Sequence, residues 1–366
     1  MTSLDLYCTQ KLNKLEHQKI SRELKNIDIL GENKISFNHK VLTNFSSNDY
    51  FGLAEHPELM KVAKSALDRF GIGAKSSRLI CGNHELYEQL ESKLANFVNS
   101  PKALVFGSGY LASSSVVPVL CDRHDLIIAD KLIHSCLLDG AMLSKAKFLR
   151  YEHNNLRQLE KLILDNKEKY KKILIITETI FSMDGDHANI NQIIEIAKKY
   201  KSIILSDNAH GFGLNEKTNY YEGHIKLGTL SKGIGCYGGY VAGSEALCSL
   251  MLNKARGFIY STALPASIIA AAIKAIELIE KGDVVEDLKR NIDLFSCKAG
   301  LSSRCSPIFV KKFVTIDQMQ KKHNYIIENG FYTGAIRPPT VKEPRLRISI
   351  SATHDKSDLV KLAELL

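Results

Sequence analysis

Short apolar runs alternate with amphipathic stretches from about residue 57 of this chain onward. Apolar side chains recur at helical spacing over 58–70, 85–98, 156–166 and 190–200. Runs rich in β-branched residues stand among them at 103–106, 126–129, 173–177, 203–206 and 225–229. Such alternation is typical of βαβ crossovers, in which helices cover both faces of the sheet. The pattern therefore predicts an α/β fold around a mostly parallel sheet.

The two ends of the chain show a different pattern. Residues 4–26 predict a polar amphipathic helix, and short strands follow at 34–37 and 41–45. A long helix is expected over 267–280. Helices then alternate with strands expected at 307–311, 331–336 and 346–350.

The length of 366 residues, of which 45% are hydrophobic, allows a large core and two lobes. We therefore predict three parts. Residues 1–50 form the N-terminal helix and short strands, which pack with the small lobe. Residues 51–282 form a large cofactor-binding domain, and residues 283–366 form a small α+β C-terminal domain.

Composition excludes several classes of protein. The net charge of +9 comes mostly from lysines scattered on polar helix faces, which argues against nucleic-acid binding but suits an acidic partner. The most apolar stretch, 263–280, contains Pro265 and Lys274 and is too broken to span a membrane. The N-terminus lacks the apolar core of a signal peptide, and the eight cysteines form no C-x-x-C pair. These features predict a soluble cytoplasmic protein with reduced thiols and no metal site.

Two residues near strand ends indicate the chemistry. Asp207 closes the run 203–206, and Lys232 follows the run 225–229 within GTLSKG. Ligands of parallel sheets bind at the carboxyl ends of the strands. A lysine there can form a Schiff base with an aldehyde cofactor, and a carboxylate can keep the ring nitrogen of that cofactor protonated. The pair predicts pyridoxal 5′-phosphate, although a helix cap at Asp207 and a surface lysine at Lys232 would explain either residue alone.

A phosphate site is predicted close to this pair. Gly109 and Tyr110 follow the strand 103–106 and open a helical stretch, where backbone amides can bind an anion. Thr229 and Ser231, beside Lys232, offer hydroxyl donors to the same phosphate. The alternative is an ordinary turn at Gly109 and a core position for Tyr110.

Three further side chains lie where they could contact such a cofactor. His134 follows the strand 126–129 and could stack on the ring, whereas a helix cap is the plainer interpretation. His210 is close enough to Asp207 to reach the phenolic oxygen of the ring. Ser182 lies in a polar loop after the strand 173–177 and is a candidate cofactor or substrate contact.

An arginine near the C-terminus is expected to bind a carboxylate. Arg345 and Arg347 are two apart in a predicted strand and so face the same side. Guanidinium groups bind carboxylates in a bidentate manner that lysine cannot match. The alternative is an edge strand with solvated arginines.

Several of these motifs, in this order, resemble the α-oxoamine synthases, which are pyridoxal phosphate-dependent transferases of fold type I. The resemblance extends over nearly the whole chain. The matching segments are 44–53 (NFSSNDYFGL), 77–90 (SRLICGNHELYEQL), 106–110, 177–186, 206–213 and 228–235.

The segments 335–341 (AIRPPTV) and 345–349 most resemble the branch of that family that condenses L-alanine with a pimeloyl thioester in biotin biosynthesis. The resemblance implies a homodimer and a coenzyme A or acyl-carrier-protein thioester. It implies catalytic roles for Lys232, Asp207 and His134. It also implies cofactor contacts from Gly109, Tyr110, His134, Ser182, Asp207, His210, Thr229 and Lys232, and substrate contacts from Arg22, His134, Thr340 and Arg347.

Two kinds of alternative stay open. Glycine C-acetyltransferase and 5-aminolevulinate synthase share the chemistry and differ in the amino acid and the acyl chain. A non-catalytic scaffold subunit could keep the same fold, although a scaffold has no need of Lys232 beside Asp207.

Overall fold

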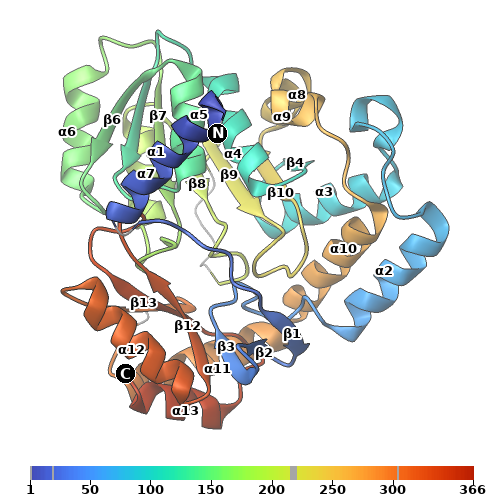
Figure 1. The fold of residues 1–366 in the computed structure, drawn as a ribbon. Coiled ribbons are helices and arrows are strands. Elements are labelled where there is room, and N and C mark those ends of the chain that lie inside the picture. Colours follow the sequence, from blue (N-terminus) through green and yellow to red (C-terminus); the bar gives the residue numbers. More distant parts are fainter. Residues whose placement is uncertain (1, 19, 215–220, 303–304) are drawn as a thin grey trace.

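The computed structural model describes residues 2–18, 20–214, 221–302 and 305–366, and its strands form two sheets (Figure 1). The seven-stranded sheet has the order β4-β10-β9-β8-β7-β5-β6. Its strands are β4 (Lys102–Phe106), β10 (Gly239–Gly243), β9 (His224–Thr229), β8 (Ile203–Asp207), β7 (Ile173–Glu178), β5 (Leu126–Asp130) and β6 (Lys147–Tyr151).

This sheet is mostly parallel, as the sequence predicts. Strands β9, β8, β7, β5 and β6 pair in parallel. Strand β10 is the exception, because it runs antiparallel to both β4 and β9. Two strands of this sheet were not predicted: β10, whose five residues begin and end with glycine, and β6, whose burial is incomplete at this sheet edge.

Helices cover both faces of the seven-stranded sheet. Within β5, Ile127 packs in one core with α4 (Gly109–Leu120), α5 (Ser135–Ser144) and α8 (Glu245–Lys254). Its neighbour Ile128 packs in another core with α6 (Leu156–Asn166) and α7 (Ile190–Lys199). Successive side chains of a strand point to opposite faces, so a sheet buried on both sides requires an unbroken apolar run.

A third core lies near β4 and β10 and extends to the second sheet. It contains side chains from α2 (Pro57–Phe70), α3 (Glu85–Phe97) and α10 (Ala266–Lys281). The short helix α9 (Arg256–Ile259) and the π-helical turn Arg78–Gly82 lie at the margin of these layers.

The six-stranded sheet combines both ends of the chain in the order β1-β2-β3-β12-β13-β11. Strand β3 pairs in parallel with β12, which joins the N-terminal strands to the C-terminal ones. The strands are β1 (Asp28–Gly31), β2 (Lys34–Phe37), β3 (Lys40–Phe45), β12 (Phe331–Ile336), β13 (Arg345–Ser349) and β11 (Ile308–Lys312). The helices of this region are α11 (Asp283–Ala299), α12 (Ile316–Glu328) and α13 (Lys356–Glu364). The division into parts 1–50, 51–282 and 283–366 stays a prediction.

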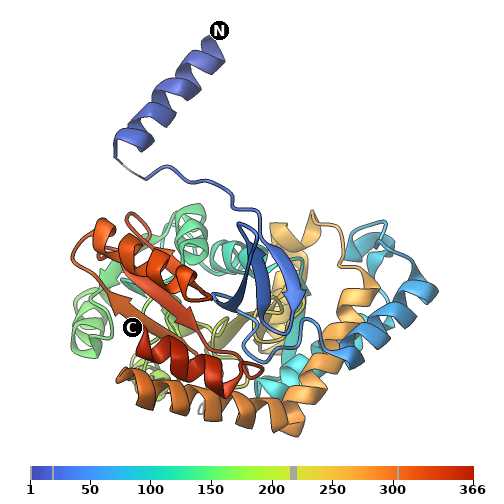
Figure 2. The same cartoon turned by 60° about the horizontal axis from the view of Figure 1, so that its bottom comes forward.

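The N-terminal helix is shorter than the sequence predicts. Helix α1 covers Ser3–His17 instead of 4–26, and the described residues that follow it, up to β1, form no helix. Figure 2 shows α1 standing away from the rest of the chain, and none of its residues is buried. Helix ends are set by packing as much as by propensity, and here no packed surface extends the helix.

Among the residues that the structure describes, no helix combines the length and the hydropathy needed to cross a bilayer. Within the same residues, no cluster of three or more His, Cys, Asp and Glu side chains could hold a metal ion.

Candidate active site

A cavity of about 260 Å³ lies at the carboxyl ends of β7, β8 and β9. The first turns of α4 and α5 close it from the sides, because each helix begins shortly after a parallel strand ends. The predicted site residues that line it are Gly109, Tyr110, His134, Asp207, His210, Thr229 and Lys232. The fold thus brings together residues that lie far apart in the sequence.

Asp207 and Lys232 both lie in this cavity and are largely removed from water. Asp207 is the last residue of β8 and is 7% exposed, and its Oδ1 accepts a hydrogen bond from the Ala209 amide at 2.9 Å. Burial raises the pKa of Asp207, and the charge of Lys232 opposes that rise. Burial lowers the pKa of Lys232, and the carboxylate of Asp207 opposes that fall.

His210 connects Lys232 to a hydrogen-bond chain that leads toward the second sheet. Burial and the nearby charge of Lys232 lower the pKa of His210 well below its usual value, so the ring is neutral. Its Nε2 is 2.8 Å from the Lys232 Nζ, and its Nδ1 is 2.6 Å from the Tyr50 hydroxyl. With Lys232 protonated, Nε2 accepts and Nδ1 donates to Tyr50.

The chain of contacts continues from Tyr50 to Arg347 of β13. The Tyr50 hydroxyl donates to Asn48 Oδ1 at 3.2 Å and accepts from Arg347 Nη2 at 3.3 Å. Arg347 also donates through Nε to the Ser182 carbonyl at 2.7 Å and through Nη2 to Asn48 at 3.1 Å. The buried Arg347 is therefore held in place by groups of both sheets.

Arg345 has a different environment, although it lies on the same side of β13. Its Nη1 donates to Asp184 Oδ1 at 2.7 Å and to the Met183 carbonyl at 3.0 Å. It thus forms a partly buried ion pair with Asp184 in the loop after β7. Of the two arginines, only Arg347 contacts the Tyr50–His210 chain in the described residues.

The opposite side of the cavity has the features of an anion site. Helix α4 begins at Gly109, and Ser108 caps it by accepting from the Leu111 amide at 3.1 Å. A Cβ on Gly109 would lie 3.2 Å from the Thr229 Cβ, so glycine leaves this approach open. The Thr229 and Ser231 hydroxyls are 2.7 Å apart and face the same space.

His134 is a helix cap that also faces the cavity. It caps α5, because its Nδ1 accepts from the Cys136 amide at 3.3 Å, and it also lines the cavity. Burial lowers its pKa, which favours a neutral ring. Its stacking role stays a prediction.

Four predicted contacts lie outside the lining of the cavity, and one of them, Arg347, is connected to it only through Tyr50 and His210. Ser182 contacts a residue that lines the cavity, because its amide donates to Glu178 Oε2 at 3.3 Å. Arg22 and Thr340 are exposed, Arg22 in the segment between α1 and β1 and Thr340 in a turn before β13. A single chain does not bring these last two residues to the cavity, and their roles stay predictions.

Several residues of the site were not predicted from the sequence. Glu178 ends β7 as Asp207 ends β8, so the same strand-end signal could have found it. Cys136 and Ser113 line the cavity from α5 and α4, and nothing in the sequence pattern marks them. Asn48 and Tyr50 lie within the segment 44–53, which was used only for the resemblance.

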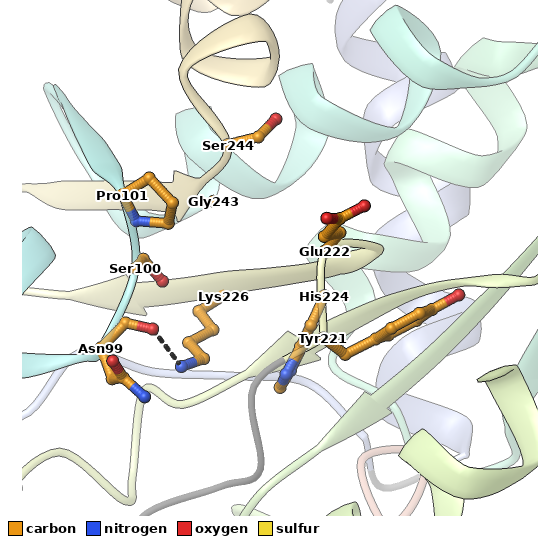
Figure 3. A pocket seen from close by; sticks show the side chains of 9 residues that line it. All are labelled: Asn99, Ser100, Pro101, Tyr221, Glu222, His224, Lys226, Gly243 and Ser244. Carbon is orange, nitrogen blue, oxygen red and sulfur yellow. Dashed lines mark hydrogen bonds between the residues drawn. The ribbon is translucent and has the colours of Figure 1, made fainter.

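A second recess lies at the other end of β9 and is shown in Figure 3. Its volume of about 10 Å³ leaves room for no more than a water molecule. Lys226 Nζ donates there to the carbonyl oxygens of Val98 and Asn99, the latter at 3.1 Å. The recess is a packed junction and not a ligand site.

Comparisons with known proteins agree with this geometry. The chain belongs to the aminotransferase class I and II family, whose model matches residues 40–366. Within that family it is similar to proteins named 8-amino-7-oxononanoate synthase. The protein of that name from Beijerinckia indica subsp. indica is 37% identical over 376 residues, which cover 100% of this chain and 97% of the relative. The one from Methylorubrum extorquens is 38% identical over 369 residues, with 100% and 95% covered.

Solved structures show the same fold. Serine palmitoyltransferase from S. paucimobilis superposes with a TM-score of 0.88 at 23% identity, covering 100% of this chain and 97% of that one. The 8-amino-7-oxononanoate synthase of Francisella tularensis has a TM-score of 0.76 at 28% identity, covering 88% and 96%. The predictions of an α-oxoamine synthase, of an enzyme and of a fold type I architecture are confirmed.

Proposed function

We propose that this chain catalyses the pyridoxal phosphate-dependent condensation of L-alanine with a pimeloyl thioester. The products would be 8-amino-7-oxononanoate, carbon dioxide and the free carrier thiol. The supporting observation is the cavity that holds Asp207 and Lys232 together at the ends of β8 and β9. The names of the relatives, which match this chain over its full length, support the particular reaction.

The residues of the cavity fit the cofactor. The first amides of α4 at Gly109, with the hydroxyls of Thr229 and Ser231, suit a phosphate, because helix N-termini attract anions. Asp207 suits a protonated ring nitrogen, and Lys232 suits the aldehyde. When bound, pyridoxal phosphate supplies an electron sink that stabilises negative charge at the amino acid Cα.

Lys232 is placed to move the proton of the amino acid. Its lowered pKa gives a larger share of neutral amine, which can accept a proton near neutral pH. The neutral His210, 2.8 Å from Nζ, can take up the hydrogen bond that the ammonium form donates. His134, which lines another side of the same cavity, would cover the cofactor ring.

Arg347 would bind the alanine carboxylate, since Tyr50 and His210 connect it to Lys232. It is 6% exposed, and its guanidinium is oriented by the Ser182 carbonyl, Asn48 and Tyr50. A pre-oriented guanidinium loses little freedom on binding a carboxylate.

The acyl donor and the assembly are the finer parts of the proposal. The net charge of +9 favours an acidic acyl carrier protein over coenzyme A alone, since opposite charges speed association. We further propose a homodimer in which the exposed Arg22 and Thr340 reach substrate only after assembly.

Product analysis tests the proposal directly. Purified protein with pyridoxal phosphate is incubated with alanine, glycine or serine and with pimeloyl, acetyl or succinyl thioesters on either carrier. Mass spectrometry should find 8-amino-7-oxononanoate from alanine and the pimeloyl thioester at a rate at least tenfold above any other pair. A preference for glycine with the acetyl or succinyl donor would assign the chain to a different α-oxoamine synthase activity. No product from any pair would favour the scaffold alternative.

A further inference from the structure

Glu178 stands beside Asp207 in the cavity and has no part in the chemistry described above. It is the last residue of β7, and its Cα pairs with that of Asp207 in the parallel register. Paired residues of adjacent strands project from the same face of a sheet, with strands about 4.8 Å apart. Both side chains are buried, with 2% and 7% exposure, and both line the cavity. Two carboxyl groups thus share one buried site.

Glu178 has few hydrogen-bond donors for a charged group. Its Oε2 accepts from the Ser182 amide at 3.3 Å, and the backbone amide of His134 also favours the charged form. Its Oε1 is buried and has no hydrogen-bond partner in the part of the chain that the structure describes. A buried carboxylate with an unpaired oxygen is costly, whereas a protonated carboxyl carries no charge and gains an O–H donor.

The charged and titratable groups around Glu178 also favour its protonated form. Asp207 from β8 repels a second negative charge, and Lys232 is the ammonium that attracts one. From α5, His134 offers a ring whose pKa is lowered, and Cys136 a thiol whose pKa burial raises to about 12, so neither adds a cation. Burial, followed by the charge of Asp207, raises the pKa of Glu178 well above its usual value.

We propose that Glu178 is a positioning residue that holds a proton in the native protein at neutral pH. Its neutral carboxyl leaves Asp207 as the single anion of the pair and offers Asp207 a hydrogen-bond donor. The importance for catalysis rests on the proposed function, because Asp207 would face the cofactor ring. The protonation of Glu178 does not rest on it.

A proton held only in the native state makes stability depend on pH. The native pKa lies above the unfolded value, so the stabilising contribution is complete below the unfolded pKa of about 4.5 and is lost as pH rises toward the native pKa. Glu178→Gln keeps the shape and a donor but cannot ionise in either state. The difference in stability between this variant and the unmodified protein should therefore grow with pH above about 4.5.

The test uses the full chain without cofactor, followed by thermal unfolding from pH 5 to pH 8.5. Glu178→Gln should match the unmodified protein near pH 5 and melt roughly 3 °C higher at pH 8. The control Glu364→Gln, at an exposed position of α13, should show the same pH dependence as the unmodified protein. A Glu178→Gln variant that melts lower at pH 8 than the unmodified protein would show that Glu178 is charged and would overturn the proposal.

A second measurement tests the positioning role. Pyridoxal phosphate is titrated against each variant and its binding is followed by visible absorbance. Glu178→Gln should bind within about threefold of the unmodified protein, whereas Glu178→Met, which has no donor, should bind about tenfold more weakly. Equal affinity in Glu178→Met would refute the positioning role. If the unmodified protein itself bound no pyridoxal phosphate, the proposed function would fail, and the melting experiment would still decide the protonation of Glu178.

Discussion

A half-buried lysine lies near each end of strand β9. Near the beginning, Lys226 donates to backbone carbonyl oxygens just after α3, beside a recess of about 10 Å³. Past the other end, Lys232 donates to the neutral His210 and faces a cavity of about 260 Å³. Burial lowers the pKa of both amines, that of Lys226 to about 8.

The comparison shows that a lowered amine pKa does not by itself mark a reactive lysine. In the described part of the chain, Lys226 donates to carbonyl oxygens, and these suit a structural ammonium at the end of a helix. Lys232 lies in an open cavity that two carboxyl groups and two histidines also line. A reactive lysine needs such partners and room for a ligand, in addition to burial.

The largest effect is expected from removing the amine in the cavity. Lys232→Ala should lose the visible absorbance of lysine-bound pyridoxal phosphate and reduce kcat by at least about 10⁴-fold, because it removes both the covalent anchor and the proton acceptor. Spectra before and after borohydride treatment, with a product assay, measure both effects. The matched control, Lys226→Met, should keep the absorbance. A yellow, reducible adduct in Lys232→Ala would place the anchor elsewhere.

The next effect concerns the acid that faces Lys232. Asp207→Asn should still bind pyridoxal phosphate but lower kcat by about 10³-fold, which corresponds to about 4 kcal/mol, since an amide cannot hold a protonated ring nitrogen. Absorbance titration measures binding and a steady-state assay measures kcat. Turnover within tenfold of the unmodified enzyme would contradict the proposed role of the carboxylate.

A moderate effect is expected at the arginine on the second sheet. Arg347→Lys should raise the KM for alanine roughly tenfold, because lysine cannot reproduce the bidentate contact. Arg345→Lys is the control, since Arg345 pairs with Asp184 and should leave this KM within about twofold. A steady-state assay measures both KM values. If Arg345→Lys raised the KM for alanine and Arg347→Lys did not, the carboxylate contact would belong to Arg345.

The smallest effect is expected at the other end of β9. The native pKa of Lys226, about 8, lies below the unfolded value, so the unfolded state binds more protons between these pKa values. The stability of the unmodified protein should therefore rise from about pH 8 toward pH 10, and Lys226→Met should lack that contribution. In thermal unfolding, the difference in Tm between the unmodified protein and Lys226→Met should change by roughly 2 °C over this pH range. A difference independent of pH would mean that Lys226 is not buried as an amine.

The sequence was sufficient for five strands of the seven-stranded sheet and for the central pair of the site. Runs such as 126–129 and 203–206 are apolar on both faces. Where such runs alternate along the chain with amphipathic helices, they predict buried strands of a parallel sheet. Asp207 and Lys232 could be placed together because parallel strands deliver their carboxyl ends to one edge of the sheet.

Other features depend on contacts that the sequence does not show. Strand β10 is recognisable only from its pairing with β4 and β9, because a short glycine-bounded run also suits a loop. The end of α1 at His17 has no glycine or proline to mark it. Arg345 and Arg347 differ in the loop atoms to which they donate hydrogen bonds, and these partners are set by the tertiary structure.

The parallel pairing of β3 with β12 has a consequence for biosynthesis. A ribosome releases the N-terminal strands early, yet their neighbour in the sheet is translated only when most of the chain is already outside. Until then, β3 presents an unpaired backbone edge of the kind that promotes aggregation. Newly made protein should therefore depend on chaperones until translation is almost complete, and fragments that stop before Phe331 should be prone to precipitate.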